Sequence, residues 1–533
     1  TVLSVPTDVD TGIPANDFTR GQAFYDLVIE VNPTNDLKLF AGGIDIFDST
    51  NGGTSWNQKS LWTGGTFQEV HSDQHAAVFA PGAPNKMVFG NDGGVYFSND
   101  SGDIISARNN GFNVTQFYSI GVSPTNNGLP GDNFVAGAQD NGSQMFLNVA
   151  AGQNESVEVQ GGDGAHSMFD QDGVDQYRIT NYVYNNTIRM WYYNAPANFV
   201  NPRSINTESG TSGDNGQFIT PMALDSNLDI LYSDYFKNPN YQIRRYKRLK
   251  GPLSVQKATL SNPLLNSLAT AIKVSPYTTA TTTLLIGTRN GRLLKVTNAD
   301  NGTTVPGALI AWSNISGPGF VGSISDVEYG NSENEIFVTM HNYNVVSVWY
   351  TADGGVTWQN KEGNFPDIPV KAVLRNPLNV DEVIIGTELG VWYTNTFNNA
   401  SPTWVQSYNG MSNVKVTDLD LRNDNVVFAA TYGRGIFSGA FTAPSLSTIN
   451  FENTNAVVVS PNPSNGLYSI QIKDISSRVN VKVADINGKE VFSKNDVNAD
   501  QIKSIDLSNL QSGVYILNVN GQKLNYTEKL IKN

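Results

Sequence analysis

One pattern recurs along the first 440 residues of this 533-residue chain and restricts its fold more than any other feature. A run of β-branched or aromatic residues ends in glycine, a tight turn follows, and a second such run returns. This order is typical of a β-hairpin, and we expect the glycine to supply the positive φ that short turns need. The clearest copies read LFAGGIDIF, VFGNDGGVYF, FVAGAQDNGSQMF, LLIGTRNGRLLKV, VIIGTELGVWYT and VFAATYGRGIFS.

The spacing of these hairpins predicts the architecture. The residues that end the first runs are Gly42, Gly90, Gly137, Gly287, Gly386 and Ala430, which are separated by 48, 47, 150, 99 and 44 residues. The two long gaps leave room for three weaker copies, RITNYVYNNTIRMWYY, ILYSDYFKNPNYQIRRY and IFVTMHNYNVVSVWYT. About nine repeats of roughly 44–52 residues, each long enough for four strands, predict an all-β chain made of β-propeller blades.

Nine blades exceed the usual number in one ring, so a division between two propellers is the alternative. The last repeat, VKVTDLDLRNDNVVFAATYGRGIFSGAF, has room for only three strands. It therefore needs a closing strand from elsewhere, either near Thr1 or from a region that precedes it.

Two turns carry a second signature, because STNGGTSW and TADGGVTW both read Ser/Thr-x-Asp/Asn-x-Gly-x-Thr/Ser-Trp. The Asp or Asn side chain can accept hydrogen bonds from nearby backbone N–H groups, and the glycine permits the bend. The residues of the two copies are Ser49, Asn51, Gly53, Trp56, Thr351, Asp353, Gly355 and Trp358.

These turns resemble the Asp-box (BNR) repeats of sialidase-like, sortilin-like and xyloglucanase-like propellers. SNDSGDII and TNADNGTT resemble degenerate copies. The resemblance implies that the Asp box is structural and lies between the third and fourth strands of a blade, away from the ligand face.

The chain changes character after Phe441. Residues 442–456 are polar and are typical of a linker, which leaves residues 1–441 for the propeller region. Short alternating runs with turn residues between them then predict a small Ig-like β-sandwich over residues 457–533.

Four ordered motifs in this last segment resemble the type A C-terminal sorting domain, which marks cargo of the type IX secretion system of Bacteroidetes. They are PNP followed by NG, Asp485 with Gly488-Lys489, LQSGVYIL, and the terminal EKLIKN. The export residues are Pro461, Asn462, Pro463, Gly466, Gly488, Gly513, Tyr515, Lys529 and Lys532. An appended Ig-like sugar-binding or spacer module is the alternative.

The resemblance to the sorting domain implies a route for the chain. Its partners would be the outer-membrane translocon of type IX secretion and a shuttle barrel protein. The chain would cross the periplasm, and the sorting domain would then be cleaved, leaving the cargo secreted or attached to the cell surface.

Composition excludes several kinds of chemistry. The chain has no cysteine, which rules out disulfides, thiolate metal sites and cysteine nucleophiles. No apolar run is long enough to predict a transmembrane helix. The chain begins at Thr1, so we expect either a removed signal peptide or a longer precursor.

The charge is distributed unevenly. The net charge is −14, and the segment from Ser445 onward carries +1, so the preceding 444 residues carry −15. Nucleic-acid binding needs clustered Lys and Arg, so we expect no nucleic-acid partner. An acidic surface keeps an extracellular protein soluble.

Candidate chemistry concentrates in three neighbouring repeats, which hold VHSDQHAAVFAP, GNDGGVYF, GAQDNGSQ and GGDGAHSMF. In a propeller, the entries into innermost strands and the turns between second and third strands lie on one face around a central funnel. The expected binding funnel consists of His71, Asp73, His75, Asn91, Asp92, Gln139, Asp140, Asn141 and His166.

Three readings of this funnel stay open. A glycosidase needs two carboxylates across one bond, and the candidates are Asp73, Asp92, Asp140 and Asp163. The xyloglucanase-type catalytic motif and the sialidase arginine triad are not evident, which disfavours hydrolysis. His-x-x-x-His at a strand entry is not the helical zinc pair, so we expect no metal and no cofactor. The third reading is that these side chains only cap turns.

Two further motifs have structural interpretations. Arg434 in TYGRGIF is expected to bond backbone carbonyls at a Gly-x-Gly turn rather than to act in catalysis. The aromatic run Tyr182 to Asn194 could stack on sugars, although packed strand faces explain it more simply. We therefore expect a non-catalytic extracellular module for glycans or proteins, with a secreted glycoside hydrolase as the alternative.

Overall fold

The structure is a computed structural model that describes residues 3–150, 152, 156–174, 176–194, 198–199, 202–208, 215–302, 309–407, 410–411, 413–444, 457–473, 478–521 and 524–533. Most of the expected linker, residues 445–456, lies outside the described residues. The chain divides into two compact units, Thr1–Ala443 and Pro444–Asn533.

The first unit is built from antiparallel sheets of consecutive strands, as expected for an all-β chain. Its first sheet consists of β1 (Val28–Asn32), β2 (Asn35–Gly42), β3 (Ile46–Ser49) and β4 (Asn57–Gln58). Its second sheet consists of β5 (Gln74–Ala80), β6 (Ala83–Asn91), β7 (Gly94–Ser98) and β8 (Ser106–Ala107). The third sheet consists of β9 (Phe117–Val122), β10 (Asp132–Ala138), β11 (Ser143–Val149) and β12 (Val157–Gln160). The fourth sheet consists of β13 (Gly164–Phe169), β14 (Tyr177–Tyr182), β15 (Ile188–Asn194), β16 (Asn198–Phe199) and β17 (Arg203–Asn206). Short 3-10 turns, η1 (Thr125–Asn127) and η2 (Val183–Asn185), interrupt these two sheets.

Five further sheets complete the first unit among the described residues. The fifth consists of β18 (Met222–Asp225), β19 (Ile230–Asp234), β20 (Ile243–Lys247) and β21 (Gln256–Leu260), and the sixth of β22 (Ala269–Val274), β23 (Leu284–Thr288), β24 (Leu293–Thr297) and β25 (Ala311–Asn314). The seventh consists of β26 (Ile324–Tyr329), β27 (Ile336–Met340), β28 (Val348–Thr351) and β29 (Gln359–Asn360), and the eighth of β30 (Val370–Arg375), β31 (Val383–Thr387), β32 (Gly390–Thr394) and β33 (Val405–Ser407). The last consists of β34 (Val416–Leu421), β35 (Val426–Thr431) and β36 (Ile436–Ala440). The last sheet has three strands, and no described residue pairs with the free edge of β36.

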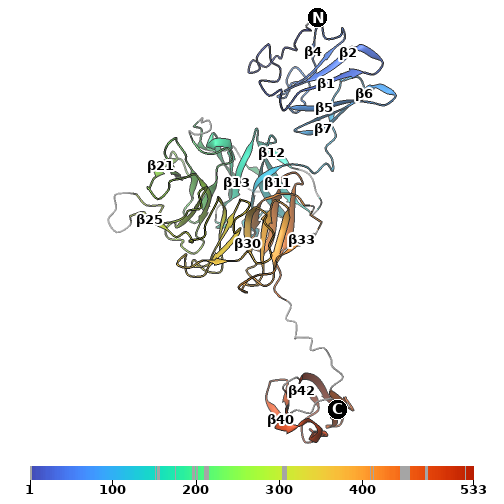
Figure 1. Cartoon of the computed structure of the whole chain (residues 1–533), viewed down its shortest axis with the longest axis vertical. Coiled ribbons are helices and arrows are strands. Elements are labelled where there is room, and N and C mark those ends of the chain that lie inside the picture. The colour runs from blue at the N-terminus through green and yellow to red at the C-terminus, as the bar shows by residue number, and fades with distance from the viewer. Residues whose placement is uncertain are drawn as a thin grey trace. The chain divides into compact units, whose positions relative to one another are not determined.

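The sheets from β9 to β36 lie face to face, as the cyan to orange ribbons of Figure 1 show. Contacts join the first strands of successive sheets, from β18 to β22, β26, β30 and β34. Strand β34, the first of the last sheet, contacts β9 in the same way, and β9 contacts β13.

A repeated hydrogen bond accompanies these contacts. The hydroxyl group of Ser325 in β26 donates to the carbonyl of Val370 in β30 over 2.6 Å. The hydroxyl of Thr417 in β34 donates to the carbonyl of Phe117 in β9 over 2.8 Å. The sheet that begins with β34 is therefore joined to the sheet that begins with β9 by the same kind of bond that joins the consecutive sheets of β26 and β30.

The turn glycines Gly94, Gly142, Gly291 and Gly390 have the positive φ that was predicted for these hairpins, whereas the glycines that end the first runs have a different function. Gly42, Gly90, Gly137, Gly287 and Gly386 lie at or near the ends of strands and do not have positive φ. A Cβ atom on Gly137 would lie 1.8 Å from the carbonyl oxygen of Ala165, and one on Gly287 would lie 2.4 Å from Cγ2 of Ile324. These two glycines repeat because the neighbouring sheet approaches them too closely for a side chain.

The turn between β3 and β4 is closed by side chains. The hydroxyl oxygen of Ser49 accepts from the backbone N–H of Gly53 at 2.9 Å, and Oδ1 of Asn51 accepts from that of Ser55 at 2.9 Å. Thr351 and Asp353 make the same two bonds between β28 and β29. Ser98 and Asp100 repeat them a third time, in the degenerate copy. The second degenerate copy, from Thr297, extends into residues outside the described part.

The second unit packs two sheets over one core, as a sandwich does. A three-stranded sheet has the order β37 (Val457–Ser460), β38 (Leu467–Ile472), β41 (Ser504–Asp506), and a four-stranded sheet has the order β40 (Glu490–Asn498), β39 (Arg478–Asp485), β42 (Gly513–Gly521), β43 (Leu524–Lys532). One 3-10 turn, η3 (Ala499–Gln501), precedes β41. Tyr468 and Ile505 of the first sheet share a buried cluster with Val481 and Leu517 of the second.

Replacing Asp353 by alanine is expected to lower the midpoint of thermal unfolding by a few degrees. The carboxylate bonds the side chain and the backbone N–H of Thr357, and these bonds lower its pKa to about 2. Asp353→Asn is the matched control, because Asn51 holds the equivalent turn of the first sheet. Calorimetry on the three proteins checks this, and equal loss in both variants would contradict the turn-closing role.

Candidate functional site

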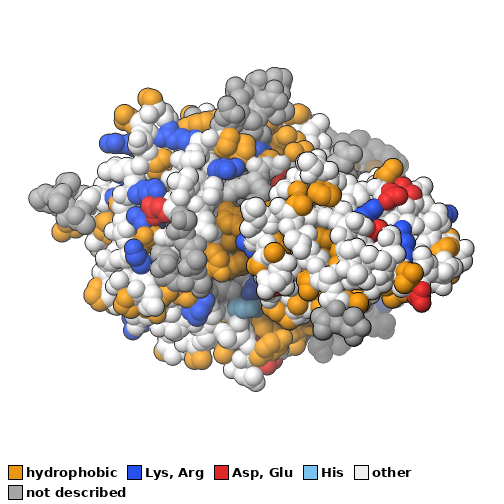
Figure 2. Space-filling model, turned by 90° about the horizontal axis from the view of Figure 1, so that it is seen from above, with side chains coloured by type: hydrophobic (Ala, Val, Ile, Leu, Met, Phe, Trp, Pro, Cys, Tyr) orange, Lys and Arg blue, Asp and Glu red, His pale blue; other side chains and the backbone are white. Residues whose placement is uncertain are grey.

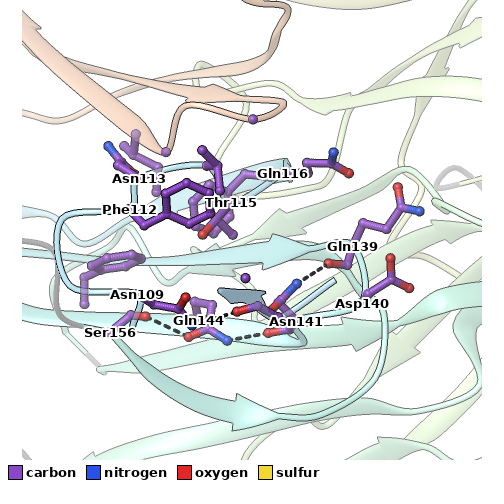
Figure 3. A pocket seen from close by; sticks show the side chains of 18 of the residues that line it. Asn109, Phe112, Asn113, Thr115, Gln116, Gln139, Asp140, Asn141, Gln144 and Ser156 are labelled. Carbon is purple, nitrogen blue, oxygen red and sulfur yellow. Dashed lines mark hydrogen bonds between the residues drawn. The ribbon is translucent and has the colours of Figure 1, made fainter. Parts of the chain in front are cut away.

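A cavity of about 960 Å³ lies within the first unit, between the turns of the second sheet and the strands of the third and last sheets. Figure 3 labels several amide side chains that line the cavity, among them Asn113, Gln116 and Gln144. The lining includes Asp92 and Asp140 together with Tyr25, His75, Asn109, Phe112, Asn113, Gln116, Gln139, Asn141 and Gln144.

Three carboxylates meet at one margin of this cavity. One oxygen from each of Asp73, Asp92 and Asp140 lies within 4.8 Å of the other two, and all three residues are half-buried. Asp73 immediately precedes β5, Asp92 occupies the turn between β6 and β7, and Asp140 lies between β10 and β11. Residues that are far apart in the sequence therefore form one acidic cluster.

Local backbone geometry positions two of these residues. Asp73 has φ of 64° and Asp140 has φ of 56°, in the left-handed region that aspartate tolerates better than most residues. The N–H of Asp73 donates to the carbonyl of Ile44 at 3.2 Å. The N–H of Asp140 donates to Oδ1 of Asp163 at 3.1 Å, so Asp163 supports the turn from the next sheet.

Both nearby histidines are engaged by oxygen atoms. Nε2 of His75 lies 2.6 Å from Oδ1 of Asp92, and its Nδ1 lies 3.2 Å from the carbonyl oxygen of Tyr25. Nε2 of His71 lies 2.9 Å from the carbonyl oxygen of Asp140, and its Nδ1 lies 3.2 Å from that of Ser72. The hydroxyl group of Tyr25 also donates to Asp92 at 3.1 Å.

One buried aspartate was not predicted from the sequence. The side chain of Asp26 is 0% exposed, and neither of its carboxylate oxygens accepts a hydrogen bond from a described donor. Burial and the adjacent Asp73 carboxyl raise the pKa of Asp26 to about 7. The sequence holds a signal for it, since FYDLVIE runs into β1 and lies 48 residues before the entry to β5 that carries Asp73.

The electrostatics of the acidic cluster are unfavourable to ionised carboxylates. Burial and then the charge of Asp163 raise the pKa of Asp140 to about 7, with a further contribution from Asp92. Burial and Asp92 also raise the pKa of Asp73. Like charges so close together favour uptake of a proton or a cation.

The predicted amides hold the surrounding turns. Nδ2 of Asn141 donates to the carbonyl of Asp92 at 3.0 Å, which joins the second sheet to the third. Oδ1 of Asn91 accepts from the N–H of Gly93 at 3.0 Å. Oε1 of Gln139 accepts from the hydroxyl groups of Tyr118 and Tyr432.

Other candidates lie apart from this margin. His166 lies in β13 and does not line the cavity, and burial lowers its pKa to about 4. The guanidinium of Arg434 is exposed and bonds no carbonyl among the described residues, so the expected role is wrong; the turn is held by the hydroxyl of Thr431, which donates to Gly435. In the aromatic run, Trp191 bonds the hydroxyl of Thr180.

In the second unit, separate motifs of the chain meet at its terminal strand. Nδ2 of Asn462 donates to the carbonyl of Lys529 at 2.7 Å, and its Oδ1 accepts from the N–H of Ile531 at 2.9 Å. Ser464 bonds the same strand through its backbone, since its N–H donates to Ile531. The Pro-Asn-Pro segment is thus attached to the last strand.

The remaining motif residues shape the same domain. Gly466 has φ of 105°, and a Cβ atom there would lie 2.7 Å from Cα of Ser508. Gly488 lies in the turn between β39 and β40, with φ of 82°. The backbone of Gly513 pairs with that of Lys532, and the buried Tyr515 donates its hydroxyl proton to the carbonyl of Gln511.

Residues 458–533 match the family described as "Secretion system C-terminal sorting domain". No curated protein sequence matches this chain. Among the described residues, none of the helices has the length and apolar character needed to span a membrane. The sorting domain implies interaction with the type IX secretion machinery and export of this cargo across the outer membrane to a secreted or cell-surface location.

Proposed function

We propose that this type IX secretion cargo carries a non-catalytic β-propeller region that binds a glycan in the cavity beside Asp92 and Asp140. The sorting domain would deliver that binding module, with the outer-membrane translocon and a shuttle barrel protein as partners. The cavity is the observation that carries the glycan proposal, and the linked sheets carry the propeller proposal.

The propeller proposal rests on the ring of contacts. Strand β34 contacts β9 as the first strands of consecutive sheets contact each other, which supports an arrangement of the seven sheets from β9 to β36 as seven blades of one ring. Burial raises the pKa of Asp420 of β34, and the charge of Lys273 of β22 opposes that rise, so charges on inner strands of non-adjacent sheets influence one another. The two sheets from β1 to β8 would be blades of a further propeller. The hydrogen-bonded turns at Ser49 and Thr351 support the Asp-box interpretation.

The glycan proposal rests on the chemistry of the cavity lining. The side chains of Asn113 and Gln116 are exposed and make no hydrogen bond to other described residues, so they are free to bond sugar hydroxyls. The ring of Phe112 is 46% exposed beside them and can cover an apolar sugar face (Figure 3). An exposed aromatic ring with free amides suits a polar, uncharged glycan.

Nucleic acid fits this surface poorly. On the face in Figure 2, Lys and Arg side chains are scattered among hydrophobic and other side chains. Phosphate recognition needs gathered basic side chains.

Glycoside hydrolysis is the second candidate, and one observation favours it. Asp140 has a pKa of about 7, as a general acid does, and its carboxylate lies within 4.8 Å of that of Asp92. Asp92, however, already accepts bonds from Tyr25 and His75, and of the acidic cluster only Asp92 and Asp140 line the cavity. Binding without cleavage therefore accounts for more of the geometry.

A polysaccharide screen with the purified chain tests glycan binding. For any glycan bound, Phe112→Ala is expected to weaken affinity roughly tenfold, a loss of about 1.4 kcal/mol. Gln256→Ala, an exposed change in β21 away from the cavity, is the control and should leave affinity unchanged. Release of shorter sugars by the wild type, abolished in Asp140→Asn, would establish the hydrolase instead.

Deleting the chain from Gly513 onward is expected to retain the protein inside the cell envelope. The deletion removes β42, which lies between β39 and β43, and it removes the strand that holds Asn462. An opened sheet with half its core missing cannot present the sorting surface. Fractionation of the native host, with blotting for the first unit, checks the location. Equal amounts of truncated and full-length protein outside the cell would contradict the sorting role.

A further inference from the structure

The acidic cluster beside the cavity holds more negative charge than its surroundings offset. Asp73, Asp92 and Asp140 approach within 4.8 Å, and Asp163 bonds the backbone of Asp140. Among the described residues, the ion pair between His75 and Asp92 is the one that involves any of these side chains. No described Lys or Arg pairs with them.

Asp26 is an independent indication that something else binds here. Its side chain is fully buried, its two oxygens accept no hydrogen bond from a nitrogen or hydroxyl group of another described residue, and its carboxyl lies beside that of Asp73, with which it can share only a proton. A carboxylate that is buried without a hydrogen-bond donor loses its hydration and gains no compensating interaction. A cation held by Asp73 would offset the charge of Asp26 as well.

The donor atoms identify the class of cation. Both ring nitrogens of His71 and of His75 already face oxygen atoms, which leaves carboxylate oxygens as the available ligands. Hard oxygen ligands select calcium or magnesium rather than zinc or copper. Ligands from three separate loops form an irregular site, which calcium accepts more readily than magnesium does.

We propose that Asp73, Asp92 and Asp140 bind a calcium ion, with the buried Asp26 as an acidic neighbour that strengthens the site. The sequence led to the opposite expectation, no metal, because His71 and His75 are expected at a strand entry and not on a helix, where two histidines at this spacing form a zinc pair. The ion would tie together the entry to β5, the β6–β7 turn and the β10–β11 turn. Calcium binding is independent of the glycan proposal and is measured without any glycan.

Calorimetric titration of the chelator-treated full chain with calcium chloride tests the proposal. Extracellular calcium modules bind with Kd on the order of 0.1–1 mM, and we expect a value in this range. Ten millimolar calcium, about ten times the weaker limit, is expected to raise the midpoint of thermal unfolding by about 2–5 °C. Magnesium at the same concentration should produce a smaller rise.

Two variants separate metal binding from a structural role. Asp73→Asn and Asp140→Asn should each weaken calcium binding at least about tenfold. In chelator, both should melt at or above the wild-type temperature, because each removes one repelling charge. Asp36→Asn, an exposed change in β2, is the matched control and should bind calcium as the wild type does.

Three results would overturn the proposal. Wild-type protein that binds no calcium up to 10 mM would show that a shared proton, not a metal, neutralises the cluster. Unchanged calcium affinity in both cluster variants would place the ion elsewhere. Variants that melt well below the wild type in chelator would show that the cluster is structural without metal.

Discussion

Backbone N–H groups that donate to aspartates of a neighbouring sheet join the inner strands of the first unit at two of the contacts between its sheets. Adjacent sheets share no strand-to-strand ladder among the described residues, so these bonds supplement the apolar contacts between them. Oδ2 of Asp418 accepts from the N–H of Ile120 at 3.0 Å, and Oδ2 of Asp420 accepts from that of Val122 at 2.8 Å. These bonds join strands that are 298 residues apart in the chain. Asp326 makes the equivalent bond to Val373 between β26 and β30.

Burying these carboxylates has an energetic cost, and the pKa of Asp418 reflects it. Desolvation raises the pKa of Asp418 to about 7, and the backbone bond from Ile120 opposes that rise. A carboxylate of this kind stabilises the fold only while its donor stays in place, since the charge would otherwise be buried without a partner. Close glycine contacts bring other neighbouring sheets together, as Gly137 of β10 does against Ala165 of β13.

Much of the fold could be predicted from the sequence, because the repeat acts locally. Each hairpin carries its own turn residues, so the all-β class and the four-stranded antiparallel sheets followed from spacing alone, as did the three strands of the last repeat. The positive φ predicted for these hairpins was correct for the turn glycines and wrong for the glycines that end the runs, because close approach between sheets is a tertiary effect that no single hairpin reveals. The sorting domain was recognisable because its motifs are ordered along the chain, and Asn462 shows why they occur together: it bonds the terminal strand.

The candidate site was less predictable than the fold. The residues near Asp73, Asp92 and Asp140 lie in repeats, so their topological positions could be inferred. Tyr25 and Asp26 lie at the entry to β1, 48 residues before Asp73 and Gln74 at the entry to β5, and they complete the acidic cluster. The repeats were counted from their second strands, so the entry to the first strand of the first sheet was not considered.

Closure between β34 and β9 is the central claim, and amide hydrogen exchange of Ile120 and Val122 tests it most directly. If the ring is closed, both amides exchange as slowly as that of the buried Val135 in β10, and Asp418→Ala accelerates exchange at Ile120 roughly 100-fold or more. Exchange of both wild-type amides at the rate of exposed loop residues would contradict the account, because the carboxylates of β34 would then not be bonded to β9.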